Sequence, residues 1–421
     1  MWLRATPPAN YRPMTLAKNL KYILLNESFP LDMAYSEYAI FRGQRALREA
    51  VGRRASFAFP EVKRLTSDTG PEVYVLIIGE SSRRESWSLF GYGRKTNPQL
   101  ASLVGKGLIP FSGIRSNANL TIYSLPLALT GNAPAESRRA SEEKSIVGLA
   151  KQAGFDTYWI SAQEMFGGAA GPVGSIAEEA SHVQFLDVSP RKGRGFEIDN
   201  GAYDEQVLRP FKEALAQETG NTKKVIVIHT MGSHYEYLSR VPAERRVFNS
   251  VGSRGTGTEA KSPAGEKLDA YDDSILYTDY VIKNVIDILA GLRYPSAMLY
   301  FSDHGERMYC EAYPHESFGH GFLPPSEDEL DVPVLLWFSK SYERRYPPLA
   351  EAARANAHLK TSLGSVFDTF ADLMRVDLRR TRRNQSLLSQ SPGPASLDVF
   401  GVDGTVLVKG LPQRVCGPDH L

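Results

Sequence analysis

Acidic and imidazole side chains stand just beyond two apolar runs of this sequence. Asp303 and His304 follow the run Ser296–Phe301, and Glu80 follows the run Val73–Gly79. Loops at the carboxyl ends of parallel strands are where open α/β sheets gather their chemistry. Carboxylate and imidazole side chains are ligands that suit zinc or manganese. The sequence therefore predicts a divalent-metal site whose ligands come from distant segments.

Other ionisable side chains are candidates for the same site. They are His229, His234, His315 and His320. A lone histidine in an apolar run, such as His229, is more often a hydrogen-bonded core residue than a ligand. Glu306 has the simpler interpretation of capping the turn that follows it. Asp303 beside His304 is harder to explain without a function, because burying a carboxylate that has no partner is costly.

The stretch 116–131 supplies a candidate nucleophile. It is typical of a polar loop that enters a short apolar helix, with Asn119 or Thr121 near the helix N-terminus. The helix dipole and its first N–H groups favour an anion there. A hydroxyl at this place could attack phosphorus with help from a divalent cation, although composition alone favours the interpretation of Thr121 as a simple N-cap. The rival hydroxyls are Ser81, Ser82 and Ser124.

Short β-rich runs that alternate with helical segments must position these side chains. The alternation predicts an α/β fold, with a central, mostly parallel sheet and helices on both faces. The predicted strands are Val73–Gly79, Thr157–Ser161, Lys224–His229, Ala297–Ser302 and Val332–Phe338. The predicted helices include Ser141–Gly154, which starts at a capping residue and stops at glycine, and Tyr271–Leu292, which has an apolar stripe.

The two ends of the chain and one internal segment have weaker patterns. Residues 1–70 are interpreted as an N-terminal linker or peripheral arm, and residues 71–421 as one catalytic domain. Within the arm, residues 14–51 could touch a membrane surface or pack against the body. Residues 250–267, rich in Gly, Ser, Thr and Pro, predict a loop. Val402-Asp403-Gly404 predicts a late hairpin.

Composition excludes some functions and leaves others open. With 49 Lys and Arg against 48 Asp and Glu, the net charge of +1 gives no general field that would favour nucleic acid. No apolar run approaches the roughly 18 residues of a membrane-spanning helix, and the start lacks the apolar core of a signal peptide. We therefore expect a soluble chain, which is either the catalytic part of a longer, anchored polypeptide or a naturally soluble protein. We also expect a monomer. Cys310 and Cys416 are too few for a disulfide framework.

At this point the sequence resembles a known family, the phosphoethanolamine transferases of the alkaline phosphatase and sulfatase superfamily. The similar segments span residues 72 to about 410, in the same order and with similar spacing. They are 75–84, 88–98, 229–234, 271–280, 302–306, 319–322 and 332–337. Each segment alone would be weak, but together they form a specific signal.

The resemblance implies the fold, the cofactor and the site residues. It implies an alkaline phosphatase-like fold and a Zn²⁺ ion bound by Glu80, Thr121, Asp303 and His304, with Thr121 also the nucleophile. His234 and His320 match imidazoles that contact the transferred phosphoryl group or a second metal. The segment around Thr121, and the lack of several disulfides, resemble the lipopolysaccharide-core branch more than the lipid A branch.

The resemblance also implies partners and a location. Phosphatidylethanolamine would be the donor, lipopolysaccharide or another glycan the acceptor, and the periplasmic face of the inner membrane the location. A phosphodiesterase, a sulfatase-like hydrolase or a phosphoglycerol transferase would use the same fold. The sulfatase alternative is disfavoured because neither cysteine lies in a Cys-x-Pro-x-Arg string. A degenerate binding domain is the non-enzymatic alternative.

Overall fold

The core of the structure is a seven-stranded sheet with the order β3-β9-β8-β2-β7-β5-β6. The computed structural model describes residues 44–66, 70–163, 170–186, 202–218, 222–248, 263–308, 318–378, 385–393 and 397–407. The strands of the sheet are β2 (Glu72–Gly79), β3 (Leu108–Phe111), β5 (Asp156–Ser161), β6 (His182–Phe185), β7 (Lys223–His229), β8 (Ser296–Ser302) and β9 (Val334–Phe338). Strands β8, β2, β7, β5 and β6 are parallel, whereas β9 runs antiparallel between β8 and β3.

The central strands are apolar on both faces, as expected for a parallel sheet covered on two sides. In β2, Tyr74, Leu76 and Ile78 belong to one hydrophobic core, while Val73, Val75 and Ile77 belong to the other. All of β2 is buried. The strand therefore separates two cores and ends at the edge where Glu80 lies.

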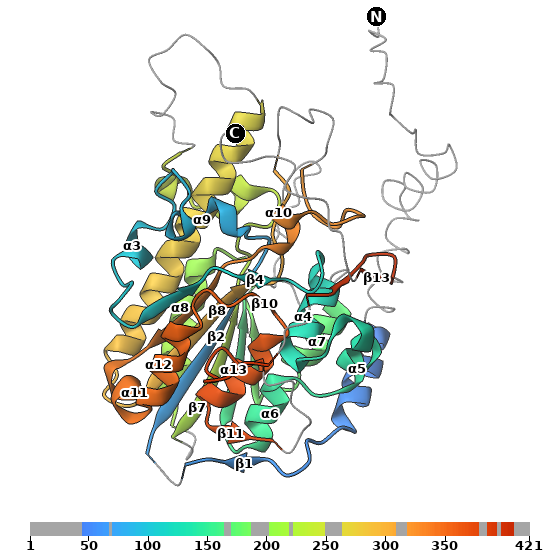
Figure 1. Cartoon of the computed structure of the whole chain (residues 1–421), viewed down its shortest axis with the longest axis vertical. Helices are drawn as coiled ribbons and strands as arrows, with labels where there is room; N and C mark the ends of the chain where they lie inside the picture. Colours follow the sequence, from blue (N-terminus) through green and yellow to red (C-terminus); the bar gives the residue numbers. More distant parts are fainter. Residues whose placement is uncertain are drawn as a thin grey trace, which may run out of the picture.

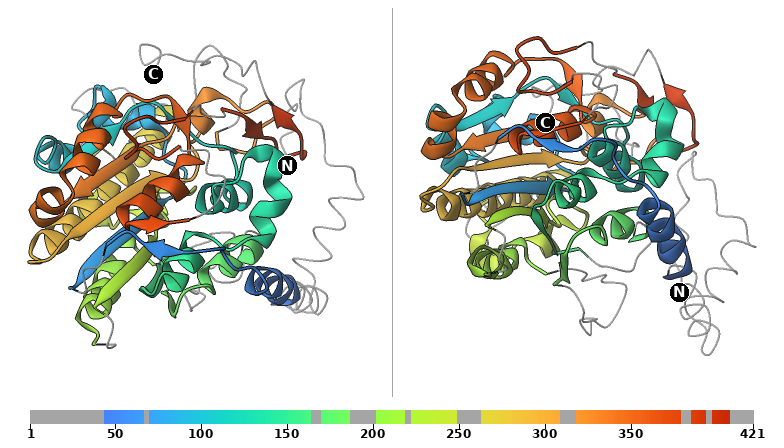
Figure 2. Two further views of the ribbon diagram at one scale, coloured as in Figure 1. Left: turned by 60° about the horizontal axis from the view of Figure 1, so that its bottom comes forward. Right: turned by 90° about the horizontal axis from the view of Figure 1, so that it is seen from below.

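Helices cover both faces of this sheet (Figures 1 and 2). The first core receives side chains from α4 (Thr121–Thr130), α6 (Ile146–Gln152), α7 (Ala170–Ala177), α11 (Lys340–Arg345), α12 (Pro347–Ala355) and α13 (Ser365–Leu373). The second receives them from α3 (Pro98–Ala101), α8 (Leu208–Ala216) and the long α9 (Pro263–Ala290). The predicted α/β architecture with helices on both faces is confirmed.

The five predicted strands all form, but the sheet also has two strands that the sequence did not reveal. β3 contains Pro110 and has only four residues, and β6 has an exposed Val183 and Gln184, so neither carries a clear strand pattern. Both lie at the ends of the strand order. β3 is mostly buried, but it is too short and interrupted by Pro110 to give a marked apolar run, whereas β6 is partly exposed and lacks the apolar run that marks central strands.

Two predicted helical boundaries were wrong. The segment 141–154 is divided between α5 (Ser137–Glu142) and α6, and the capping residue is Ser145, whose side chain accepts a hydrogen bond from the Val147 backbone N–H at 3.1 Å. Gly154, with φ +87°, does follow this helix as predicted. Helix α9 begins at Pro263, so the end of the predicted loop 250–267 is helical; proline suits a first helical turn. Residues 250–262 lie outside the described residues.

Smaller elements attach the remaining chain. The late hairpin is confirmed as β12 (Val399–Phe400) and β13 (Val406–Leu407), with Gly404 at φ +84° in its turn. Two-stranded pairs join β1 (Lys63–Arg64) to β11 (Val376–Asp377) and β4 (Ile114–Arg115) to β10 (Thr361–Ser362). A short α10 spans Glu327–Leu330.

The described part of the N-terminal segment packs against the body. Residues 44–55 form a helix, and the buried Arg54 donates hydrogen bonds to Ser175 Oγ at 3.0 Å and to the carbonyl oxygen of Ala140 at 2.8 Å. The boundary at residue 70 stays a prediction. Residues 1–43, together with His315, Cys310 and Cys416, lie outside the described residues. Among the described helices, none combines the length and apolar character needed to cross a membrane.

Candidate active site

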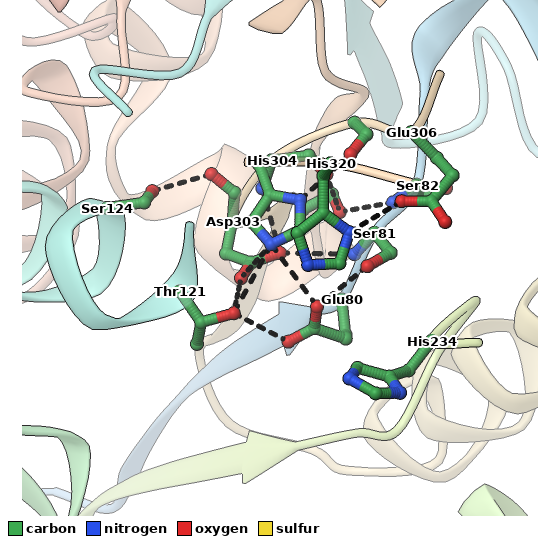
Figure 3. Close-up of polar contacts among 12 residues, drawn as sticks. Glu80, Ser81, Ser82, Thr121, Ser124, His234, Asp303, His304, Glu306 and His320 are labelled. Carbon is green, nitrogen blue, oxygen red and sulfur yellow. Dashed lines mark hydrogen bonds and ion pairs between the residues drawn. The ribbon is translucent and has the colours of Figure 1, made fainter. Parts of the chain in front are cut away.

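Three segments bring the site together at the carboxyl end of the sheet (Figure 3). Glu80 follows β2, and Asp303 and His304 follow β8. Because β2 and β8 are parallel neighbours, with Gly79 opposite Ser302, both segments leave the sheet side by side. Thr121 is the first residue of α4.

The hydroxyl of Thr121 lies among the predicted ligands. Its Oγ1 is 2.7 Å from Asp303 Oδ2, 3.1 Å from Glu80 Oε2 and 3.3 Å from His304 Nε2. Leu120, rather than Thr121, occupies the N-cap position, and the Thr121 side chain makes no cap hydrogen bond. The alternative interpretation of Thr121 as a simple N-cap is therefore wrong, because its hydroxyl faces carboxylates instead of its own helix.

His304 is oriented by its own backbone. Its Nδ1 lies 2.8 Å from the carbonyl oxygen of Gly305, which accepts only when Nδ1 carries the proton. In that tautomer Nε2 keeps its lone pair, and Nε2 lies 3.3 Å from Asp303 Oδ2 and 3.4 Å from Glu80 Oε1. This is the arrangement by which proteins fix a metal-binding histidine.

Burial and mutual repulsion set the charges of the two carboxylates. Burial alone would raise the pKa of Glu80, but the imidazoles of His304, His234 and His320 outweigh it and lower that pKa to about 2. Burial raises the pKa of Asp303 well above its usual range, and the negative charge of Glu80 adds to the shift. Two buried acids this close need a cation if both are to be ionised.

A strained turn holds Glu80 against Asp303. Ser81 has φ +53°, which is unusual for a residue with a side chain. Its backbone N–H donates to Asp303 Oδ1 at 3.2 Å, and its hydroxyl donates to Glu80 Oε1 at 2.8 Å. The hydroxyl of Tyr271 donates to the Ser81 carbonyl at 2.7 Å, which fixes the turn from α9. These contacts favour a positioning role for Ser81 over its alternative role as the nucleophile.

The other two rival hydroxyls also have structural partners. Ser82 Oγ accepts a hydrogen bond from Trp87 Nε1 at 2.8 Å. Ser124 Oγ donates to the Asp303 carbonyl at 2.5 Å, as does Ser116 Oγ at the same distance. Ser116 and Ser124 therefore hold the backbone of Asp303, a predicted ligand.

His320 lies over His304 and is held by Glu306. The two rings have centroids 4.1 Å apart, and the ligand atoms of Glu80, His304 and His320 all lie within 4.8 Å of one another. Glu306 is fully buried; its Oε2 lies 2.6 Å from His320 Nδ1, and its Oε1 accepts from the Tyr237 hydroxyl at 2.6 Å. The prediction that Glu306 caps a turn was wrong, because both of its oxygens contact side chains.

Two other candidate histidines, His234 and His229, make no polar contact with Thr121 in the described part of the chain. His234 stands apart from the cluster in Figure 3, with its ring centroid 6.3 Å from that of His320 and its Nδ1 beside the Tyr235 carbonyl. His229 is buried below the site next to Ser161, and burial lowers its pKa to about 4, so it is neutral near pH 7. The simpler interpretation of His229 as a core residue is the one that its surroundings support.

Two contacts to the site come from residues without a marked sequence signal. Gln163 Nε2 donates to Glu80 Oε2 at 3.3 Å and to the carbonyl oxygen of Thr230 at 2.8 Å. Gly232, with φ +51°, lies so close to Glu80 that an added Cβ would be 2.8 Å from its backbone nitrogen and oxygen. A glutamine after a strand and a glycine before a histidine are common, so neither could have been singled out.

The donor set fits a metal ion. Two carboxylates, an imidazole Nε2 with its lone pair available and a hydroxyl converge within hydrogen-bonding distances, and both carboxylates are buried. Oxygen and nitrogen ligands in this number suit zinc. A bound cation would compensate the paired acids when both are ionised, a state whose burial is otherwise costly.

Asp204 holds the turn that carries His234, and its titration is testable. Its carboxylate accepts from the backbone N–H groups of Met231 at 2.7 Å and Gly232 at 2.9 Å, yet burial raises its pKa from 3.8 to about 6. A raised pKa gives stability that is present below the unfolded-state value and is lost as pH rises through the folded-state value.

We therefore expect wild-type protein to lose stability relative to Asp204→Asn as pH rises from about 3.5 to about 7.5, by up to about 3 kcal/mol. Urea unfolding of both proteins across this range measures the difference. A difference that stays constant, or that grows in favour of the wild type with rising pH, would contradict the assignment.

Comparison with known proteins defines the class. A model of the sulfatase family matches residues 72–376. This chain therefore belongs to the sulfatase family. The crystal structure of the C-terminal periplasmic domain of EptC from Escherichia coli, a complex with zinc, is similar at 25% identity with a TM-score of 0.70, covering 82% of this chain and 93% of that one. A putative sulfatase, yidJ from Bacteroides fragilis, shares the fold at 15% identity and a TM-score of 0.50. The expected alkaline phosphatase-like fold is confirmed.

Curated relatives carry more specific names. Phosphoethanolamine transferase EptC of Escherichia coli (strain K12) is 29% identical over 326 residues, which are 75% of this chain and 53% of the relative. Putative transferase YhbX of the same strain is 34% identical over 272 residues, 65% of this chain and 44% of the relative. The chain thus spans about half the length of the curated relatives it matches. The resemblance to phosphoethanolamine transferases is confirmed.

Proposed function

We propose that this protein is a zinc-dependent phosphoethanolamine transferase. It would move phosphoethanolamine from phosphatidylethanolamine to lipopolysaccharide or another glycan through a phosphothreonine intermediate. One observation carries the proposal: the Thr121 hydroxyl lies within 3.3 Å of a carboxylate pair and an imidazole at the start of a helix. The names of EptC and of its zinc complex support the same activity and the same metal.

The first half-reaction transfers the group to the protein. Thr121 Oγ1 forms a bond to phosphorus, and the bond between phosphorus and the donor's alcohol oxygen breaks. The proton of the threonine hydroxyl is balanced by the proton that the departing alcohol gains. The first turn of α4 and the imidazole of His320 face this position and favour the negative charge on the phosphoryl oxygens.

The second half-reaction restores the threonine. The acceptor hydroxyl forms a bond to phosphorus while the Thr121 Oγ1–P bond breaks, and the acceptor's proton returns to the threonine oxygen. His320, held at Nδ1 by Glu306, presents Nε2 as a group that can give or take a proton. His234, at the edge of the cluster, is proposed to contact the transferred group.

A zinc ion would be held by Glu80, Thr121, Asp303 and His304. When bound, it would favour the ionised form of the nucleophile and neutralise charge on the phosphoryl group. The protein's own contribution is to hold the ligand side chains in place before the reaction, through Ser81, Ser116 and Ser124. Such preorganisation is a large part of catalysis.

The place of action follows from the proposed donor. An integral membrane phosphoethanolamine transferase from Neisseria meningitidis shares the fold at 22% identity, with a TM-score of 0.64. A lipid donor must be reached at a membrane surface, so we propose action at the periplasmic face of the inner membrane. The proposed unit is a monomeric catalytic domain over residues 71–421, preceded by the arm 1–70.

Intact-mass spectrometry tests the proposal. The protein is incubated with zinc and a short-chain phosphatidylethanolamine, and a mass increase of one phosphoethanolamine group is expected. Adding a lipopolysaccharide core oligosaccharide should then discharge the adduct and produce a modified oligosaccharide. If free phosphoethanolamine accumulates while no acceptor is modified, the protein is a hydrolase. If no adduct forms under any of these conditions, the proposed route is wrong.

A further inference from the structure

We propose that Glu329 is a positioning residue that holds the Thr121 loop and the His320 loop in one arrangement. The proposal rests on the proposed function, because it gives Glu329 an indirect part in that reaction. Glu329 belongs to α10, which lies above the carboxyl end of the sheet (Figure 1). The polar contacts of Glu329 among the described residues go to Asn119, Arg307, Phe322, Ser326 and the Gly305 backbone, and not to Glu80, Asp303 or His304.

Both oxygens of Glu329 accept several hydrogen bonds. Oε1 accepts from Asn119 Nδ2 at 2.7 Å and from the Phe322 backbone N–H at 3.1 Å. Oε2 accepts from the Ser326 backbone N–H at 2.9 Å, from Ser326 Oγ at 3.0 Å and from Arg307 at 2.9 Å. These five donors are distributed over four positions of the chain, so one side chain connects segments that do not follow one another.

Three of these segments carry functional side chains. Asn119 precedes Thr121 by two residues, Phe322 follows His320 by two, and Arg307 follows His304 by three. Asn119 Nδ2 also donates to the Phe322 carbonyl at 2.9 Å. Glu329 and Asn119 thus join the nucleophile's loop directly to the loop of His320.

The backbone of Glu329 adds a fourth connection. Its carbonyl oxygen accepts from the Gly305 N–H at 2.8 Å, beside the ligand His304. The side chain of Glu329 is fully buried, and Arg307 compensates its charge across 2.9 Å. A carboxylate is suited to this place because both of its oxygens only accept hydrogen bonds. The side-chain amide of glutamine would instead place an NH₂ donor opposite other donors.

The consequence for catalysis is geometric. In-line transfer needs the nucleophile and the group that stabilises the phosphoryl oxygens in fixed positions, and a displacement of about 1 Å can cost about 10²-fold in rate. Without Glu329, the loops of Thr121 and His320 would keep the hydrogen bond between Asn119 and the Phe322 carbonyl but lose the carboxylate that holds both ends of it. We therefore infer that Glu329 sets the distance between nucleophile and imidazole.

Glu329→Gln is the test variant, and Glu179→Gln is a matched control. Glu179 is a buried carboxylate remote from the site with nearly the same partners: it accepts from the Ser145 N–H at 2.9 Å, from Ser145 Oγ at 2.7 Å and from the Gly148 N–H at 3.0 Å, and it pairs with Arg54. Both variants therefore lose similar interactions, but only one of them lies between the two loops.

Two measurements are made on each protein. Hydrogen–deuterium exchange of residues 116–124 and 318–326 should rise together in Glu329→Gln and stay unchanged in Glu179→Gln. The rate of phosphoethanolamine adduct formation should fall about 10-fold to 10²-fold in Glu329→Gln only. Hydrogen–deuterium exchange is measured without the lipid donor. It therefore tests whether Glu329 couples the two loops even if the wild type forms no adduct and the proposed function is wrong.

Asn119→Ala supplies a second variant, which removes the bond to Glu329 from the other side together with the bond to the Phe322 carbonyl. In a double-mutant cycle, its effect on the adduct rate should be much smaller in the Glu329→Gln background than in the wild type. Additive effects would overturn the proposal, as would exchange that rises in one loop alone. Equal slowing by Glu179→Gln would assign the effect to general stability and would also overturn it.

Discussion

Replacing Thr121 with alanine is expected to reduce formation of the covalent phosphoethanolamine adduct by at least about three orders of magnitude. The Thr121 hydroxyl contacts both carboxylates and the imidazole, at 2.7, 3.1 and 3.3 Å. Alanine keeps the helix start but leaves no atom to bond to phosphorus. Intact-mass spectrometry with a time course measures the loss directly.

Two matched variants separate the nucleophile from a general effect. Thr121→Ser keeps a hydroxyl and should retain a measurable adduct that survives isolation. Thr130→Ala removes the hydroxyl at the other end of the same helix, where it donates to the Pro126 carbonyl at 2.6 Å, and should react like the wild type. An adduct that persists in Thr121→Ala at wild-type rate would remove this threonine from the reaction.

Removing the metal is expected to abolish the reaction and to lower the melting temperature. Glu80 and Asp303 are both buried, and the charge of one raises the pKa of the other. Because the ligands are assembled only in the folded chain, metal binding stabilises that state. At free zinc about 1,000-fold above Kd the shift corresponds to about 4 kcal/mol, on the order of 10 °C for a domain of this size. Calorimetry with chelator, then with added zinc, measures it.

Asp303→Asn provides the control for this second prediction. It removes one charged ligand and the repulsion with Glu80, so its melting temperature should respond little to zinc. Restored activity after zinc addition to the chelated wild type would complete the test. Protein that carries no stoichiometric zinc, and whose melting temperature and adduct formation ignore added zinc, would instead favour a degenerate domain that serves binding or assembly.

The central strands were predictable because a strand that is buried on both faces needs a continuous run of apolar residues, which is visible in the sequence. Val73–Gly79 and Ala297–Ser302 are apolar runs, and each ends directly at a predicted ligand. The positions of Glu80 and Asp303 then followed from the rule that chemistry gathers at carboxyl strand ends. The edge strand β6, with two exposed residues among four, carries no such run and stayed hidden.

The supporting contacts were not predictable, because they depend on side chains that meet only in the folded chain. Glu306 was assigned to a turn from its neighbours, yet it binds His320 fourteen residues away and Tyr237 from another element. Glu329 stands in a short acidic segment that looks like an ordinary helix start. Its bond to Asn119 joins positions 210 residues apart. No local pattern encodes a partner at that separation.

In the strand order, the proposed reaction centre and the edge strand β6 lie at different places in the sheet. The two strands that end at the ligands, β2 and β8, lie inside the sheet, while β6 lies at one end of it with Val183 and Gln184 exposed. A fluorophore attached at Val183 would therefore label the protein, and a surface tether there would immobilise it. Neither should disturb the predicted ligands Glu80, Asp303 and His304. The exposed Val183 of β6 thus gives a point of attachment for measuring how the carboxyl end of the sheet is oriented on a supported bilayer.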